Sequence, residues 1–328
     1  MPALTTSVAV ASAAAVATPR ELFLAARDAY PRAPRLTRHT VRARGLDFAV
    51  FSSPEVPGAV PLACVNGGLL FDHKVLWPSL APLAAHRQLV FYDQRGRGAT
   101  KAPPGARAAR IEHDASDLPA LREALGFARW DLLGHSWGGG IAMLAAAQDE
   151  AAVRRLVLVN AVGVTSDWLP TLHAIALTRL AGDARQALAA HDPARLVEPA
   201  PAEHAAYARA FYPAWFVDQT MPALFAAPRS ASVTGAAVAA RLRRDGYDWT
   251  ELIRALRVPT LVVHGADDVL PLAQAERTAG LIPHARLAPL TRAGHMPFWE
   301  APDRFFPLVE HFLSQPCSPV PSPSSPSA

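Results

Sequence analysis

Short apolar runs alternate with stretches of helical periodicity in two parts of the chain. The first part predicts a hairpin at 41–52, strands at 61–65, 88–92, 130–133 and 156–160, and helices at 76–85, 111–125 and 138–148. The second part predicts strands at 260–264 and 285–290, and helices at 272–281 and 304–313. Continuous apolar strands that alternate with helices are typical of a parallel sheet covered on both faces. The pattern therefore predicts an α/β protein with a mostly parallel sheet.

Helical periodicity without strands fills the segment 163–257, which separates the two parts. Helices are expected at 168–180, 183–190, 202–211, 222–225 and 236–244. Three tryptophans lie in this segment: Trp168, Trp215 and Trp249. We interpret the segment as a helical cap inserted into an α/β core, whose two parts are residues 36–162 and 258–314.

The two ends of the chain differ from this core. Residues 1–35 are expected to be a lead-in that is either partly disordered or helical, with 20–29 as the candidate first helix. Residues 315–328 are mostly Pro and Ser, which cannot bury enough apolar surface to offset the entropy of ordering, so we expect a disordered tail. Ala15-Val16-Ala17 resembles a signal-peptide cleavage site, but no positive charge precedes Arg20. We therefore expect a cytoplasmic protein, with secretion as the alternative.

Composition and charge exclude several classes of protein. Hydrophobic residues make up 51% of the chain and charged residues 18%, which excludes a wholly disordered chain. The net charge of +4 comes from 32 basic and 28 acidic residues without a basic run, so no nucleic-acid partner is expected. No apolar run is long enough to span a membrane. Two cysteines, Cys64 and Cys317, form neither a disulfide framework nor a metal-binding spacing, and no metal or organic cofactor is expected.

The strongest chemical signal is the motif G-x-S-x-G at residues 134–138. An apolar strand precedes it and an Ala-rich helix follows. Gly134 and Gly138 allow the strand and the helix to approach closely, and the sharp turn exposes Ser136 at the N-terminus of the helix. We therefore predict that Ser136 is a nucleophile.

A nucleophilic serine needs a base and a group that orients this base. His295 is the predicted base, because it follows the last strand, has a flexible Gly294 beside it, and completes the chain order Ser, acid, His. Either Asp267 or Asp268 could be the acid, and we favour Asp268, with Asp267 as a cap of the following helix. His135 is interpreted as structural, because its side chain should point away from that of Ser136.

Two backbone N–H groups are needed to stabilise an oxyanion. Trp137, directly after the nucleophile, should supply one. The turn after the strand 61–65 should supply the other, from Gly68 or alternatively Leu69, although its glycines would also serve a plain tight turn.

These residues resemble the α/β-hydrolase superfamily, in particular its branch of proline iminopeptidase-like capped hydrolases. The matching segments are 66–68, 92–98, 134–139, 265–268 and 294–297 with Glu300 and Pro302. The resemblance implies an eight-stranded, mostly parallel sheet with an inserted cap. It also selects Asp268 as the acid and implies that Asp93 and Arg95 form a structural turn.

The chain departs from the pattern of this branch at three places. Asn66 replaces the usual His before the two glycines, Leu69-Leu70 replace Pro-Gly, and His135 stands where the aminopeptidases often have Gly. The aminopeptidases also use carboxylates of the cap to hold a free amine, and the sequence does not identify such residues here.

The sequence thus predicts a serine hydrolase that cleaves an ester or amide bond of a small, apolar or aromatic substrate. Leu69, Trp168, Trp215 and Met296 are the candidate substrate-binding residues. The alternatives are a proline iminopeptidase-type aminopeptidase, an acyltransferase or C–C bond hydrolase with the same triad, and a non-catalytic ligand receptor. A further alternative is an interaction protein that acts through its tail. The oligomeric state is left open.

Overall fold

Eight strands form one sheet in the computed structural model, which describes residues 16–29, 33–225 and 231–316. The strand order is β1-β2-β4-β3-β5-β6-β7-β8, with antiparallel pairing of β1 with β2 and of β2 with β4, and parallel pairing elsewhere. The strands are β1 Thr37–Ala43, β2 Leu46–Ser52, β3 Leu62–Val65, β4 Leu89–Tyr92, β5 Trp130–His135, β6 Val153–Val159, β7 Thr260–Gly265 and β8 Arg286–Leu290. The predicted fold class, a mostly parallel eight-stranded α/β sheet, is confirmed.

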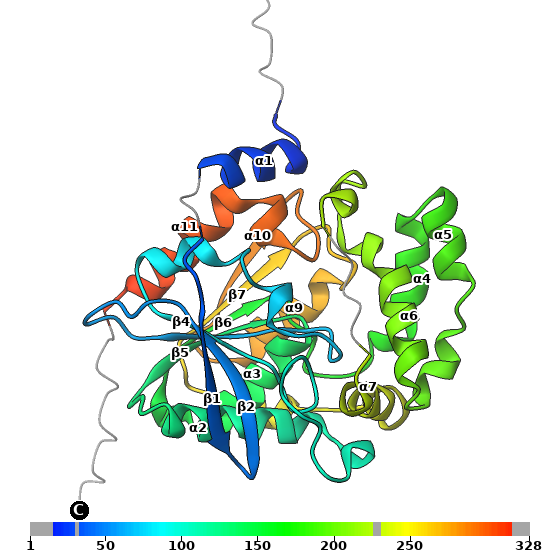
Figure 1. Cartoon of the computed structure of the whole chain (residues 1–328). Coiled ribbons are helices and arrows are strands. Elements are labelled where there is room, and N and C mark those ends of the chain that lie inside the picture. Colours follow the sequence, from blue (N-terminus) through cyan, green and yellow to red (C-terminus); the bar gives the residue numbers. More distant parts are fainter. Residues whose placement is uncertain (1–15, 30–32, 226–230, 317–328) are drawn as a thin grey trace, which may run out of the picture.

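The central strands are apolar because both of their faces are covered. Every residue of β3, β4, β5 and β7 is buried. The helices α2 Ile111–Ala124, α3 Trp137–Gln148, α8 Thr250–Arg254 and α9 Leu272–Leu281 contact one another in turn on one face. On the opposite face, α11 Pro302–Ser314 lies beside α10 Pro297–Glu300 and α1 Pro19–Ala29 (Figure 1).

The segment between β6 and β7 is helical, as its periodicity predicted. Its longer helices are α4 Leu169–Arg179, α5 Gly182–Ala189, α6 Pro201–Phe211 and α7 Val233–Asp245. They lie together to one side of the sheet, in green and olive in Figure 1. Short 3₁₀ turns connect them, including Pro193–Val197, Tyr212–Trp215 and Met221–Leu224, the last of which lies where the sequence predicted a helix at 222–225.

The prediction of a helix at 76–85 is wrong. The chain forms two short 3₁₀ turns around this region, His73–Val75 and Ala81–Ala85. Pro78 and Pro82 explain the difference, because a proline inside an α-helix removes a backbone donor and its ring clashes with the carbonyl four residues before.

The ends of the chain contribute little to the described structure. Most of the lead-in (residues 1–15, with Ala15) and most of the Pro/Ser tail (residues 317–328, with Cys317) lie outside the described residues. Cys64 is buried in β3, which raises the pKa of its thiol. In the part of the chain that the structure describes, no helix has the length and apolar character that crossing a membrane requires.

Candidate active site

Ser136 stands at a strained turn between β5 and α3. Its backbone has φ 56° and ψ −125°, and residues other than glycine rarely adopt such a positive φ. A Cβ at Gly134 would lie 2.4 Å from the carbonyl oxygen of Gly138, and a Cβ at Gly138 would lie 2.0 Å from that of Val65. The two glycines therefore allow α3 to start directly above the sheet, and the N–H groups at its first turn favour negative charge beside Ser136.

His295 is held by the carboxylate of Asp268. Its Nδ1 lies 3.1 Å from Oδ1 and 2.9 Å from Oδ2 of Asp268. Because a carboxylate only accepts, Nδ1 carries the proton of the neutral ring and Nε2 keeps a free lone pair. Asp267 is exposed instead and accepts a hydrogen bond from the backbone N–H of Arg292 at 2.8 Å. The structure thus brings Asp268, and not Asp267, to the imidazole.

The sequence analysis missed Asn160, which also holds Asp268. Asn160 follows β6, and its Nδ2 donates to Asp268 Oδ2 at 2.6 Å and to the carbonyl of Gly294 at 3.0 Å. Burial alone would raise the pKa of Asp268, but His295, His264 and Asn160 lower it to about 2. No motif marks Asn160; the available signal is a polar residue that ends an apolar strand at the carboxyl edge of the sheet.

The turn after β3 lies against Ser136. A Cβ at Gly67 would lie 2.6 Å from the Cβ of Ser136 and 3.1 Å from the backbone nitrogen of Trp137. Gly68 and Leu69 both have positive φ, 80° and 55°. This tight conformation keeps the backbone of the turn next to the start of α3, where the second N–H of an oxyanion hole was predicted.

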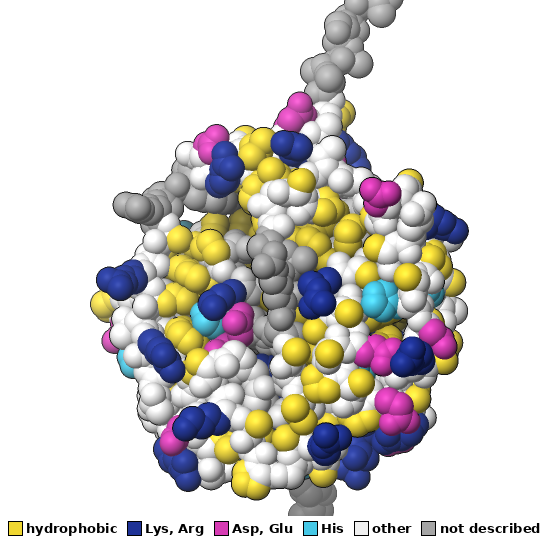
Figure 2. All heavy atoms as spheres, turned by 45° about the vertical axis from the view of Figure 1, so that its right-hand side comes forward, with side chains coloured by type: hydrophobic (Ala, Val, Ile, Leu, Met, Phe, Trp, Pro, Cys, Tyr) yellow, Lys and Arg dark blue, Asp and Glu magenta, His cyan; other side chains and the backbone are white. Residues whose placement is uncertain are grey.

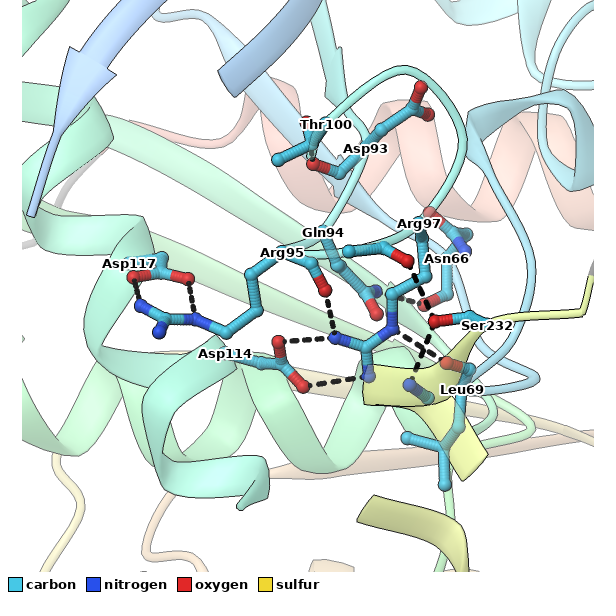
Figure 3. A network of polar contacts seen from close by, with 12 residues as sticks. Asn66, Leu69, Asp93, Gln94, Arg95, Arg97, Thr100, Asp114, Asp117 and Ser232 are labelled. Carbon is cyan, nitrogen blue, oxygen red and sulfur yellow. Dashed lines mark hydrogen bonds and ion pairs between the residues drawn. The ribbon is translucent and has the colours of Figure 1, made fainter. Parts of the chain in front are cut away.

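A buried polar network holds this turn in place (Figure 3). Arg97 donates through Nε to the carbonyl of Leu69 at 2.7 Å and pairs with Asp114 at 2.7 and 3.0 Å. Gln94 donates to the carbonyl of Asn66 at 2.8 Å, and Asn66 donates to that of Phe71 at 3.2 Å. The amide of Asn66 thus ties the two ends of the turn together at the position where the related branch usually has His.

Asp93 and Arg95 belong to the same network and lie away from the pocket. Asp93 accepts hydrogen bonds from His73 and from the backbone N–H of Ala99 at 2.8 Å. Arg95 pairs with the buried carboxylate of Asp117 on α2. Burial raises the pKa of Asp117 to about 6, although Arg95 acts to lower it. These contacts are those of a structural turn.

Ser136 and His295 line one pocket of about 780 Å³, part of which is open to solvent. The lining residues used below are Gly68, Leu69, Trp137, Trp168, His204, Tyr207, Trp215 and Arg243. Figure 2 shows one face of the molecule, on which hydrophobic side chains are widespread and charged side chains lie both near the centre and along the rim. Among the described residues, no hydrogen bond joins the Ser136 hydroxyl to the His295 ring.

Three of the four candidate substrate-binding residues, Leu69, Trp168 and Trp215, line this pocket. Met296 does not. Its side chain is 1% exposed and packs in the hydrophobic core directly before α10. The assignment of Met296 is therefore corrected: although it follows His295 in sequence, its side chain lies in the core and does not line the pocket.

His135 supports the backbone of the His295 loop. Its Nε2–H donates to the carbonyl of His295 at 2.8 Å, and the two rings are 4.8 Å apart. Burial, together with the nearby His295, lowers the pKa of His135 to about 3, so its ring is neutral. His135 thus contacts the backbone of the loop.

Comparisons with known proteins agree with this fold. The family model of the alpha/beta hydrolase fold matches residues 60–302. A 2-hydroxymuconate semialdehyde hydrolase of Pseudomonas putida is 32% identical over 241 residues, covering 70% of this chain and 78% of the relative. A proline iminopeptidase of Lactobacillus delbrueckii subsp. bulgaricus is 25% identical over 288 residues, covering 79% of this chain and 91% of the relative.

A solved structure shows the same architecture. The enol-lactonase from Burkholderia xenovorans LB400 superimposes with a TM-score of 0.66 at 25% identity, over 84% of this chain and 100% of that chain. The family match covers more than half of the residues, and the relatives named above are hydrolases. The chain therefore belongs to the α/β-hydrolase family and is an enzyme of that fold.

Proposed function

We propose that this enzyme is a serine hydrolase with Ser136 as nucleophile, His295 as general base and Asp268 as the acid that orients the imidazole. The observation that carries this proposal is the convergence of Ser136, at its strained turn, and His295, held by Asp268, on one pocket. A serine, an orienting acid and a histidine base, in this chain order, are the parts of a nucleophilic triad.

The proposed reaction starts with attack of Ser136 Oγ on a substrate carbonyl while the hydroxyl proton passes to Nε2 of His295. Asp268 stabilises the resulting imidazolium. The N–H groups of Trp137 and of Gly68, with Leu69 as the alternative to Gly68, stabilise the oxyanion. His295 then protonates the leaving group, and water that is activated by the same imidazole hydrolyses the acyl-enzyme.

The segment 163–257 is proposed to act as a cap over this site. Trp168 and Trp215 from this segment line the pocket together with Trp137 and Leu69 from the core. A lining rich in indole and aliphatic groups favours a small apolar or aromatic substrate. An ester or amide of such a molecule is the substrate class that we infer.

C–C bond hydrolysis is the second candidate reaction. The observation that favours it is the 32% identity to a protein named 2-hydroxymuconate semialdehyde hydrolase. The same serine, base and oxyanion hole serve attack on a ketone carbonyl, with a carbanion in place of an alkoxide as the leaving group. Acyl transfer to an added alcohol or amine would also use this site.

Aminopeptidase activity is less well supported. A free α-amine bound in an apolar pocket needs a carboxylate partner. No Asp or Glu lines the pocket in the described part of the chain. The proline iminopeptidase relative is also the more distant of the two, at 25% identity.

A substrate panel tests this proposal. Short p-nitrophenyl esters are compared with prolyl and other aminoacyl arylamides, on the wild type and on Ser136→Ala, with added alcohol as a competing acceptor. We expect turnover of the esters that Ser136→Ala abolishes and little cleavage of the arylamides. An alanine variant with full esterase activity would contradict the proposal.

A further inference from the structure

Arg243 brings a positive charge to the wall of the same apolar pocket. It lies near the end of α7, one helical turn after Ala239, and both residues line the pocket. On α6, His204 and Tyr207 line the pocket as well. In the described part of the chain, Arg243 is the one lining residue with a permanent charge.

The guanidinium of Arg243 makes no ion pair with any carboxylate of the described residues. Its helix neighbours differ, because Arg241 and Arg244 both pair with Asp245, at 3.5 and 2.8 Å. Two acids of the surrounding elements are engaged elsewhere: Glu203 pairs with Arg195 at 3.1 Å, and Asp192 caps the turn at Ala194 at 2.9 Å. Glu198 is exposed. The segments outside the described residues contain no Asp or Glu.

Aromatic and neutral groups surround Arg243 instead. Its guanidinium carbon lies 5.7 Å from the centroid of the Tyr207 ring. Burial lowers the pKa of Arg243, and Tyr207 only partly offsets this. His204 donates to the carbonyl of Glu198 at 2.9 Å, and burial lowers the pKa of its ring. The charge of Arg243 is therefore partly buried, next to Tyr207 and without a compensating anion among the described residues.

We propose that Arg243 binds a carboxylate of the substrate, so that the preferred substrates are anionic molecules whose reactive carbonyl lies at Ser136. This inference rests on the proposed function for the position of the carbonyl. A guanidinium donates two parallel hydrogen bonds to a carboxylate, and such charge-assisted bonds are strong where water is excluded. A neutral ligand of the same shape would leave the guanidinium without an anion.

Binding of two ligands of equal shape tests the assignment without relying on turnover. Isothermal titration calorimetry compares 4-phenylbutyrate with its neutral analogue 4-phenylbutyramide. We expect the wild type to bind the carboxylate about tenfold or more tightly than the amide, because charge-assisted hydrogen bonds are typically worth that ratio. Arg243→Gln should reduce the ratio to near one, whereas Arg243→Lys should keep part of it.

Arg244→Gln is the matched control, because Arg244 is the next residue on α7, is exposed and pairs with Asp245. Its carboxylate preference should equal that of the wild type. Should Arg243→Gln fail to fold, Arg243→Met keeps the aliphatic stem and carries the same expectation.

Two outcomes would overturn the proposal: a wild type that does not bind the carboxylate in preference to the amide at millimolar concentration, or a neutral variant of Arg243 that keeps the preference. Failure of the serine mechanism would instead appear as unaltered activity in Ser136→Ala, so the two ideas fail separately.

Discussion

The carboxylate of Asp268 is held by side chains that follow or end three different strands. His295 comes from the loop after β8, Asn160 follows β6, and His264 belongs to β7, with its Nε2 3.7 Å from Asp268 Oδ2. Each contact favours the ionised acid, which is why its pKa stays near 2 despite full burial. The orientation of the His295 ring thus depends on residues beyond the proposed triad.

Asn160→Ala tests this dependence. The substitution removes three hydrogen bonds: those that Asn160 donates to Asp268 and to the carbonyl of Gly294, and the one that it accepts from the Gly265 N–H at 3.4 Å. Asn160 does not line the pocket. We expect kcat on a p-nitrophenyl ester to fall about tenfold or more while KM changes little, because a hydrogen bond to a charged group contributes roughly 1.5–3 kcal/mol. A rise in KM with unchanged kcat would contradict a positioning role.

Arg97 illustrates a buried charge that depends on its partner. The side chains of Arg97 and Asp114 are both fully buried. Arg97→Met would leave the Asp114 carboxylate without its partner, and we expect the free energy of unfolding to fall by about 3–5 kcal/mol. Urea denaturation measures the loss. The double variant with Asp114→Leu should recover part of it, and a double variant less stable than the single one would refute this explanation.

Local sequence signals identify some of these residues and not others. Ser136 is predictable because its turn requires small residues at fixed offsets. Asp268 could be separated from Asp267 only through the family resemblance. Asn160, Arg97 and Arg243 act through contacts between distant segments, and a single sequence gives no measure of which segments meet. Met296 was misassigned for the same reason, because adjacency in sequence does not give the direction of a side chain.

At the scale of elements, the close approach of α3 to β3 positions Ser136, the proposed nucleophile. Gly138→Ala would place a methyl carbon 2.0 Å from the carbonyl oxygen of Val65, a backbone atom that cannot rotate away. We expect this variant to lose several kcal/mol of stability or not to fold, because overpacking and backbone strain both oppose it.

Gly280→Ala is the control for this variant. Gly280 lies in α9, and apart from its chain neighbours and its own helix backbone no atom of the described residues lies within 4 Å of the place that a Cβ would take there. Alanine should therefore raise the free energy of unfolding by about 0.5–1 kcal/mol through helix propensity. Equal effects of the two substitutions in thermal denaturation would contradict the packing argument.

Glu300 connects α10 to the segment between β6 and β7. It accepts backbone N–H groups of Val217 at 2.7 Å, Asp218 at 3.3 Å and Gly294 at 2.7 Å. Burial raises the pKa of Glu300 to about 7, although these hydrogen bonds oppose the shift. The loop of His295 and the turn at Trp215, whose carbonyl accepts from the His295 N–H at 2.8 Å, therefore share one buried carboxylate.

A raised pKa makes stability depend on pH in a defined direction. Between pH 4.5 and about 7 the folded chain keeps a proton on Glu300 that the unfolded chain releases, so stability falls as pH rises through this range. The contribution amounts to about 3 kcal/mol. Across this range the unfolding free energy of the wild type should fall by that amount relative to Glu300→Gln, which has no proton to release. If the unfolding free energies of the wild type and of Glu300→Gln changed equally with pH, Glu300 would not titrate in this way.

Elements with one dominant period were predictable, and those with conflicting signals were not. The strands 61–65 and 88–92 and the helix 111–125 match β3, β4 and α2 within one residue at each end. The helix expected at 76–85 failed because apolar spacing was given more weight than two prolines. A single interior proline is tolerated, as Pro119 in α2 shows, whereas two prolines lie four residues apart in the failed helix.

At the scale of the whole molecule, the pocket joins chain segments that lie far apart in sequence. Its lining comes from the turns after β3 and β5, the loops after β7 and β8, and the helices of residues 163–257. The alternation of strands and helices was sufficient to predict the sheet and the position of this helical segment in the chain. The shape of the pocket depends on how α4, α6 and α7 are placed relative to the sheet, which periodicity does not encode.

The central claim is that Ser136 is the nucleophile, and covalent labelling tests it most directly. The protein is treated with a fluorophosphonate, and its intact mass and peptide map are measured. The account predicts one adduct per chain, located on Ser136, absent in Ser136→Ala and retained in Ser116→Ala, whose serine lies on α2 outside the pocket. An unlabelled wild type, or an adduct that persists in Ser136→Ala, would contradict it.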